Sequence, residues 1–182
     1  MAAILGLEDA EVEAACAEVE GVVSAANYNA PGQVVIAGTA AAVALAIEAC
    51  KARGAKRATS LPVSGPFHCA LMVPAQEEFA ADLAAVELRM PAIPVVQNVD
   101  ASIAADVDGV RDRLLAQISR PVLWTSCVRA MAAHGVTQLA ECGPGKVLSG
   151  LVKRIDRDVE ALSLGNLDGL NAALAAQGAA HG

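Results

Sequence analysis

Short apolar runs alternate with longer amphipathic stretches over the first sixty residues of the chain. Brief apolar or alternating runs predict strands, whereas apolar positions spaced three and four apart predict helices. Pro31 and Gly32 indicate a turn between two of the strands, and Thr39 is the expected N-cap of a helix that Gly54 ends. The pattern predicts strands at residues 2–6, 22–29, 33–38 and 56–63 and helices at residues 8–20 and 39–53.

These elements follow one another in the order β-α-β-β-α-β, which is the order of a split βαβ or ferredoxin-like unit. We therefore expect residues 1–62 to form a four-stranded antiparallel sheet with two helices on one face. In that arrangement residues 22–27 pair with residues 33–38.

From residue 63 onward, helices and short strands alternate in the manner of an α/β protein. Pro74 and Pro91 bound one predicted helix, and Pro121 lies just beyond the end of another. The segment "DVDG" at residues 106–109 lacks the ligand spacing of a calcium loop and is interpreted as a helix cap. The pattern predicts helices at residues 74–87, 107–118, 125–134, 147–155 and 168–176, and strands at residues 93–99, 136–143 (a buried one) and 160–164.

Composition and charge exclude several classes of protein. The 182 residues suffice for one domain, or for a small and a medium one. Aromatic residues make up only 2% and the net charge is −7, so a nucleic-acid partner is not expected. The longest uncharged apolar stretch, residues 34–47, is too short to span a membrane, and the first residues lack the basic region of a secretion signal. We therefore expect a cytoplasmic protein with no membrane partner.

The five cysteines include no Cys-x-x-Cys pair. An odd number without paired spacing predicts reduced, mostly buried thiols rather than a disulfide framework or a zinc site. No metal is therefore expected.

His68, in "SGPFHCALM", is the strongest candidate for chemistry. It follows a predicted strand and a proline, at the start of what resembles the first turn of a helix, and the loops at strand ends carry reacting groups in α/β folds. A histidine there can act as a general base near neutral pH. The alternative is a half-buried histidine that only bonds a carbonyl group. Cys69 is not its partner, because adjacent side chains point in different directions.

Two further segments leave alternatives open. The Gly-rich stretch 141–151 fails the P-loop pattern, so it is either a tight strand-to-helix turn or a turn whose free amides bind an anion. The basic residues of 51–57 form either a solvated face or a contact for an acidic partner. None of the eight serines lies in a Gly-x-Ser-x-Gly elbow.

Five segments in register carry a family resemblance. They are "NYNAPGQVVIAG" at 27–38, "GAKRATSLPVSGPFHCALM" at 54–72, "PVVQNVDA" at 94–101, "ISRPVLWTSCVRAM" at 118–131 and "ECGPGKVLSGLVKRI" at 141–155. Together they resemble the C-terminal portion of the malonyl-CoA:acyl carrier protein transacylases of fatty acid biosynthesis. The resemblance implies a ferredoxin-like small subdomain at residues 1–62, followed at residues 63–182 by the C-terminal part of an α/β-hydrolase-like acyltransferase domain.

The resemblance also implies roles for individual residues. His68 corresponds to the catalytic histidine, and Gln117 to the residue whose backbone carbonyl orients the imidazole. Phe67 and Asn29 correspond to substrate-binding positions, with the Phe67 ring leaving little room for a branched acyl group. In the family, a serine takes malonyl from coenzyme A and passes it to the phosphopantetheine thiol of the carrier protein, so malonyl-CoA and acyl carrier protein are the implied partners and no cofactor is implied.

The chain departs from the family pattern in one respect. The family's nucleophilic serine, oxyanion-hole glutamine and malonyl-binding arginine lie upstream of every segment present here. We therefore expect an N-terminally truncated S-malonyltransferase that is inactive alone and that pairs, in one version of this hypothesis, with a separate N-terminal fragment. The alternative is a non-catalytic module that binds carrier protein or coenzyme A. A free-standing ferredoxin-like sensor is a third hypothesis, but it explains none of the segments after residue 63.

Overall fold

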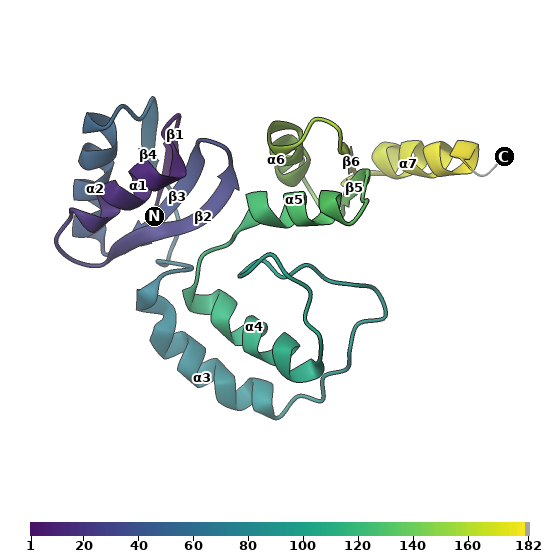
Figure 1. The fold of residues 1–182 in the computed structure, drawn as a ribbon, viewed down its shortest axis with the longest axis horizontal. Coiled ribbons are helices and arrows are strands. Elements are labelled where there is room, and N and C mark those ends of the chain that lie inside the picture. The colour runs from purple at the N-terminus through teal and green to yellow at the C-terminus, as the bar shows by residue number, and fades with distance from the viewer. Residues whose placement is uncertain (181–182) are drawn as a thin grey trace. The chain divides into compact units, whose positions relative to one another are not determined.

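The computed structural model describes residues 1–180 and the side chains of residues 1–175. The chain packs into two units, residues 1–127 and the residues from 128 onward. Within the described residues, the elements in chain order (Figure 1) are β1 (Ala2–Leu5), α1 (Asp9–Ala17), β2 (Val23–Ala30), β3 (Gln33–Gly38), α2 (Ala40–Ala52), β4 (Arg57–Ser60), the 3₁₀ helix η1 (Ala70–Met72), α3 (Val73–Ala84), α4 (Val107–Ser119), α5 (Trp124–Ala133), β5 (Gln138–Glu141), α6 (Val147–Ile155), β6 (Glu160–Ser163) and α7 (Leu167–Ala180).

The first four strands form one sheet in the order β2-β3-β1-β4, with every neighbouring pair antiparallel. Ala25 lies opposite Ile36 in the β2–β3 pair, so the predicted pairing of residues 22–27 with residues 33–38 is confirmed. Gly32 takes a φ of +68° in the turn between these strands, which explains why a glycine stands there. The predicted boundary after residue 62 falls inside the first unit and stays a prediction.

Helices α1 and α2 pack on one face of this sheet (Figure 1), where the larger apolar core lies. Ile4, Val12 and Ile36 are fully buried there. Thr39 caps α2 as predicted, because its hydroxyl accepts a hydrogen bond of 3.3 Å from the Ala42 amide. Burial raises the pKa of the Cys16 thiol to about 12 in this core. Among the described residues, four of the five cysteines are buried and all are free thiols, as the sequence predicts.

The opposite face of the sheet carries a smaller cluster, made of Ala26, Ala37 and Cys69. Small side chains on this face let the chain after β4 approach the strands closely. The segment before α5 also joins this sheet, because the Tyr28 amide donates to the carbonyl of Val122 and the Val122 amide donates to the carbonyl of Ala26, each at 2.9 Å. The sheet therefore binds two segments that are far apart in the sequence: the loop after β4, through Cys69, and the segment before α5, through Val122.

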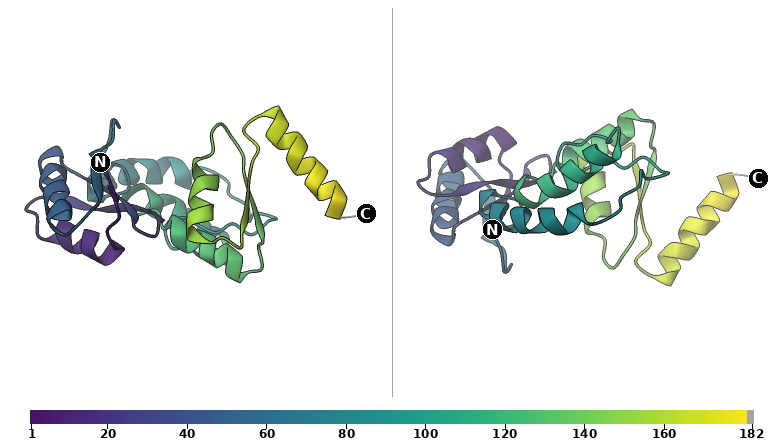
Figure 2. Two further views of the ribbon diagram at one scale, coloured as in Figure 1. Left: turned by 90° about the horizontal axis from the view of Figure 1, so that it is seen from above. Right: turned by 90° about the horizontal axis from the view of Figure 1, so that it is seen from below.

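Helices α3 and α4 form an antiparallel pair beside the sheet (Figures 1 and 2). Arg111 of α4 donates to the backbone carbonyl of Leu83, in the last turn of α3, and to that of Val86, just beyond the helix. At the other end of the pair, the Ser119 hydroxyl donates to the Gln76 side-chain oxygen at 2.5 Å. Hydrogen bonds thus fix both ends of the pair.

The apolar run at residues 93–99 is not a strand, so that prediction was wrong. Only an isolated bridge between Val96 and Ile103 forms, and Ile93 is 77% exposed. The reason is that a strand needs a neighbouring strand along its whole length, and among the described residues the bridge of this run is to a short return of its own loop. Pro94 also removes one of the backbone donors that a ladder would use.

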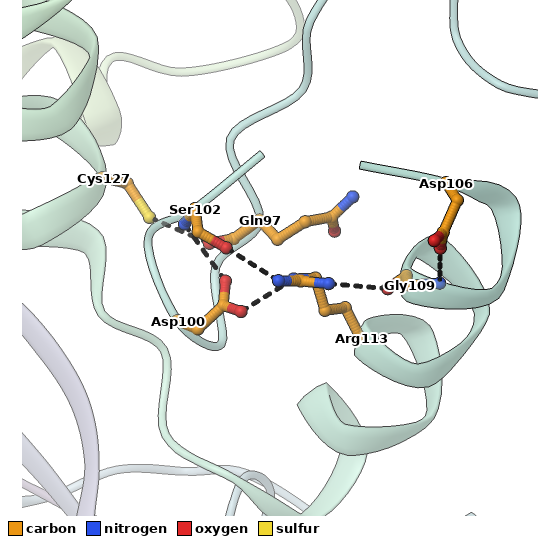
Figure 3. Close-up of polar contacts among 7 residues, drawn as sticks. All are labelled: Gln97, Asp100, Ser102, Asp106, Gly109, Arg113 and Cys127. Atoms are coloured by element: carbon orange, nitrogen blue, oxygen red, sulfur yellow. Dashed lines mark hydrogen bonds and ion pairs between the residues drawn. The ribbon is translucent and has the colours of Figure 1, made fainter. Parts of the chain in front are cut away.

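An ionic cluster holds this loop against α4 instead (Figure 3). The Arg113 guanidinium donates to Asp100 at 2.7 Å, to the Ser102 hydroxyl at 3.0 Å and to the Gly109 carbonyl at 3.0 Å. Burial by itself raises the pKa of the Asp100 carboxyl, but the hydrogen bonds from Ser102 and Arg113 outweigh that effect and lower it. Asp106 caps α4 as predicted by accepting from the Gly109 amide at 2.7 Å.

The second unit contains the parallel pair β5–β6, flanked by α6 and α7. The predicted helix at residues 147–155 is confirmed. The prediction of a buried strand at residues 136–143 was wrong in length and in burial, since β5 has four residues, none of them fully buried. A sheet of two short strands, each with a single neighbouring strand, offers too little packing to bury both faces. Within residues 1–180, no helix has the length and apolar composition needed to cross a membrane.

Candidate active site

His68 lies in the loop between β4 and η1, in the first unit, and is half-buried. Its φ is +61°, a left-handed conformation that is rare for residues other than glycine. It therefore precedes the first helical turn rather than belonging to it, which corrects the expectation from sequence. The next residue anchors this loop, since Cys69 is buried on the helix-free face of the sheet and its thiol donates to the Pro66 carbonyl at 3.1 Å.

The imidazole of His68 meets the backbone of α4. Its Nδ1 lies 2.7 Å from the carbonyl oxygen of Gln117, which is 49 residues further along the chain. A carbonyl oxygen has no proton to give, so Nδ1 carries the hydrogen and Nε2 is left with a free lone pair. The predicted contact is present. The neutral ring in this tautomer can accept a proton at Nε2, as the histidine of a catalytic triad does.

Side chains that sequence reasoning missed support this contact. Gln76 and Ser119 join α3 to α4 two residues beyond Gln117, and Arg111 ties the opposite ends of the same helices together. His68 precedes α3, so holding α3 against α4 also holds the imidazole near its acceptor. Arg111 donates to a backbone carbonyl 28 residues earlier, and Ser119 donates to a side chain 43 residues earlier. Hydrogen bonds over such separations leave no periodic or motif signal, which is why the sequence did not predict them.

The two predicted substrate-binding residues lie on different elements. Phe67 precedes His68 and is 42% exposed, and a carbon added to Gly65 would come within 3.2 Å of its ring. Asn29 is half-buried in β2, at the irregularity in the β2–β3 register between Tyr28 and Ala30. Phe67 is the chain neighbour of His68, and the substrate-binding roles of Phe67 and Asn29 both stay predictions.

The first amides of α6, directly after the Gly-rich loop at residues 143–146, donate to a side chain of the protein itself. The Glu141 carboxylate accepts from the amides of Leu148 and Ser149 and from the Ser149 hydroxyl, at 3.1, 2.8 and 2.7 Å. These hydrogen bonds, led by that from the Ser149 amide, lower the pKa of the Glu141 carboxyl. The start of α6 therefore already holds an internal anion, and the structure favours a tight turn over a site for an external one.

The basic residues of 51–57 separate into two groups. Arg53 bonds to Glu11 of α1 and to Glu18, the C-cap of that helix, and Lys51 pairs with Glu48 of its own helix at 2.8 Å. Lys56 and Arg57, at the start of the edge strand β4, are exposed. Only this second group remains a candidate surface for an acidic partner. Across residues 1–180, no group of three or more histidine, cysteine and acidic side chains is placed to hold a metal ion.

Comparisons with known proteins give one answer. The model of the acyl transferase domain matches residues 1–159. The chain is 53% identical over 176 residues to the malonyl CoA-acyl carrier protein transacylase of Escherichia coli K12, and this match covers 96% of the chain and 57% of that protein. The chain is 42% identical over 178 residues to the malonyl CoA-acyl carrier protein transacylase of Bacillus subtilis, and this match covers 96% of the chain and 56% of that protein.

Solved structures agree with these matches. The crystal structure of malonyl-CoA:acyl carrier protein transacylase from Xanthomonas oryzae superposes with a TM-score of 0.93 at 47% identity. The superposition covers 96% of this chain and 56% of the Xanthomonas chain. A malonyl-transacylase solved in complex with a type II polyketide synthase acyl carrier protein superposes with the same TM-score at 46% identity. This superposition covers 95% of the present chain and 57% of the transacylase. The chain spans about half the length of these relatives, and it belongs to the acyl transferase domain family.

Proposed function

We propose that the chain supplies the general-base half of a malonyl-CoA:acyl carrier protein S-malonyltransferase site. The observation that carries this proposal is the 2.7 Å contact between His68 Nδ1 and the Gln117 carbonyl. This contact fixes the tautomer that leaves Nε2 able to take a proton from a hydroxyl or a thiol. The curated relatives at 53% and 42% identity are transacylases of this kind, which supports the same reaction.

In the proposed mechanism, His68 moves protons in two steps. Nε2 first takes the proton of a serine hydroxyl as the oxygen attacks the malonyl thioester carbonyl, and the protonated ring then gives that proton to the departing coenzyme A thiolate. In the second step, Nε2 takes the proton of the phosphopantetheine thiol as the sulfur attacks the malonyl ester. The ring returns it to the serine oxygen when the ester bond breaks. The Gln117 carbonyl stabilises the charged ring in both steps.

The nucleophile is proposed to come from residues outside this sequence, because none of its eight serines lies in a Gly-x-Ser-x-Gly elbow. In this proposal residues 1–62, which contain the four-stranded antiparallel sheet, are the ferredoxin-like subdomain, and the helix-free face of that sheet holds the loop that carries His68. Residues 63 onward are the returning part of the acyltransferase domain. Phe67, exposed beside His68, would border the acyl group and disfavour a branched one.

An acidic carrier protein is the proposed partner of the exposed pair Lys56 and Arg57. The remaining cations of this segment are engaged by glutamates of α1 and α2, so these two are the residues available to attract an acidic surface. In a protein completed by fusion to a serine-bearing segment, we expect Lys56→Glu with Arg57→Glu to raise the KM for carrier protein and to leave the KM for malonyl-CoA unchanged. Lys51→Glu is the matched control, because that lysine is already paired. An equal rise in both KM values would contradict this docking surface.

The catalytic proposal is tested by completing the site. The 182-residue chain is assayed for malonyl transfer from malonyl-CoA to carrier protein, alone and after fusion to the serine-bearing part of the E. coli relative that it does not match. We expect no transfer by the chain alone, because both nucleophile and oxyanion donors are missing and one such donor is worth about 3–4 kcal/mol. We expect transfer by the fused protein, and loss of most of it with His68→Ala.

His134→Ala is the control for that variant. His134 belongs to the second unit, is exposed at the end of α5 and has its Nδ1 2.7 Å from the Ala130 carbonyl of that helix, so the same substitution there removes a comparable contact in the other unit. Robust turnover by the 182-residue chain alone would refute the need for an outside nucleophile. Full activity of His68→Ala in the fused protein would refute the role given to His68.

A further inference from the structure

The carbonyl group that accepts from His68 is free for a reason that lies four residues further along the chain. In an α-helix, the carbonyl of residue i accepts from the amide of residue i+4. For Gln117 that residue is Pro121, which has no amide hydrogen. The preceding carbonyl, that of Ala116, accepts normally from the Arg120 amide at 3.0 Å. Gln117 is thus the first residue of α4 whose carbonyl has no helical donor.

Proline also sends the chain away from the helix axis. A residue before proline is disfavoured in the helical region, and Arg120 has the extended values φ −111° and ψ 157°. Helix α4 therefore ends at Ser119. The next amide that could continue the helix, that of Val122, donates to Ala26 of β2 instead, and the Tyr28 amide returns a bond to Val122. The Val122 amide is therefore not a donor to the last carbonyls of α4, and the Gln117 carbonyl is reached by His68 instead.

We propose that Pro121 is a positioning residue that reserves the Gln117 carbonyl for the imidazole of His68. It does so by withholding the amide hydrogen that would otherwise occupy this oxygen. The inference rests on the proposed function for its catalytic meaning, but the hydrogen bond that it explains is a property of the folded chain. Pro121 touches no reacting atom in this account.

A simpler account makes Pro121 only a helix stop. A carbonyl oxygen has two lone pairs, so it could accept from a helical amide and from His68 together. In that case an amide at position 121 would leave the imidazole undisturbed. The two accounts differ in what they predict for the tautomer of His68, which can be measured without any activity.

The test uses the 182-residue chain with ¹⁵N-labelled histidine. Ring ¹⁵N shifts distinguish a protonated from an unprotonated nitrogen, and in the unmodified chain at a pH where the ring is neutral we expect hydrogen on Nδ1 of His68. With Pro121→Ala we expect the signal to move to the Nε2–H form or to a mixture, because the new amide competes for the Gln117 oxygen. Pro91→Ala, in the exposed loop after α3, is the matched control and should leave the Nδ1–H form unchanged.

A second variant separates the missing amide from the rigid ring and covers the case in which Pro121→Ala does not fold. Lactic acid in place of Pro121 puts an ester at this position, which has neither the ring nor an N–H. The proposal is supported if the ester variant keeps the Nδ1–H form of His68, whether Pro121→Ala shifts the tautomer or fails to fold. The proposal is overturned if Pro121→Ala folds and keeps the Nδ1–H form, or if the ester variant loses it.

In the fused, active protein, Pro121→Ala is then expected to lower kcat about ten- to a hundredfold, the range seen when a partner that orients a functional histidine is removed, with little change in KM. If the fused protein is inactive with and without the substitution, the proposed function fails. The effect of Pro121 on the His68 tautomer is still decided by the ¹⁵N measurement. An unchanged kcat together with a shifted tautomer would overturn the catalytic meaning given to Pro121.

Discussion

The backbone of His68 provides the sharpest energetic test of the site. At φ +61° an L residue costs about 1–2 kcal/mol relative to a right-handed conformation, because its Cβ crowds the following carbonyl oxygen. His68→Ala and His68→Gly both remove the imidazole and its bond to Gln117, so those losses cancel between them. Only alanine keeps the Cβ. The pair therefore isolates the strain that the folded chain stores at this residue.

The expected difference follows from two opposing effects. Glycine removes the 1–2 kcal/mol of strain, but it loses about 0.4–1 kcal/mol more conformational entropy on folding than alanine does. His68→Gly should therefore be more stable than His68→Ala by about 0.5–1 kcal/mol. At a strand or helix position with negative φ, glycine would instead be the less stable of the two.

Urea unfolding followed by tryptophan fluorescence measures this difference, because the single tryptophan, Trp124, lies in the same unit as His68. Ala70→Gly is the control. Ala70 begins η1 two residues later with a negative φ, so glycine there should destabilise by about 0.5–1 kcal/mol. The argument for stored strain is refuted if His68→Gly is no more stable than His68→Ala while Ala70→Gly shows its expected loss.

Three further predictions concern other parts of the fold. Ala101→Gly should raise the free energy of unfolding by about 0.5–1 kcal/mol, because Ala101 also has a left-handed φ, of +54°; a lower urea midpoint would contradict this. Glu141 has a lowered pKa in the folded state, so its contribution to stability is present above the ordinary value of 4.5 and is lost as the pH falls through the lower folded value. Glu141→Gln should therefore weaken this acid-dependent loss in thermal unfolding scans, and an unaltered pH dependence would count against the role of Glu141 at the start of α6. Thr39→Ala should cost about 1 kcal/mol through loss of the α2 cap, whereas Thr39→Ser should cost less, as measured by chemical unfolding.

The sequence determined most of the local structure of the first sixty residues. Pro31-Gly32 marked the β2–β3 turn, and Thr39 marked the start of α2. Such signals act between neighbours in the chain, so they can be read without knowing what lies across the fold.

Local pattern failed where a partner decides the outcome. Residues 93–99 are apolar enough for a strand, yet no strand lies along them, and the cluster of Asp100, Ser102 and Arg113 holds the loop instead. The 136–143 run became a short pair with half-exposed side chains for the same reason. A strand is stable only if its hydrogen bonds are completed by another segment, and composition does not specify which one.

The candidate site shows the same division. His68 was singled out by its position after a strand, but residue patterns alone left open whether it served catalysis or merely bonded a carbonyl group. Family resemblance supplied Gln117 as its partner. Only the tertiary structure showed how a contact spanning 49 residues is held, through the α3–α4 pair, the buried Cys69 and the proline that ends α4. Closing a loop of that length costs entropy that no single local motif repays, so the geometry of the site depends on packing distributed over the whole unit.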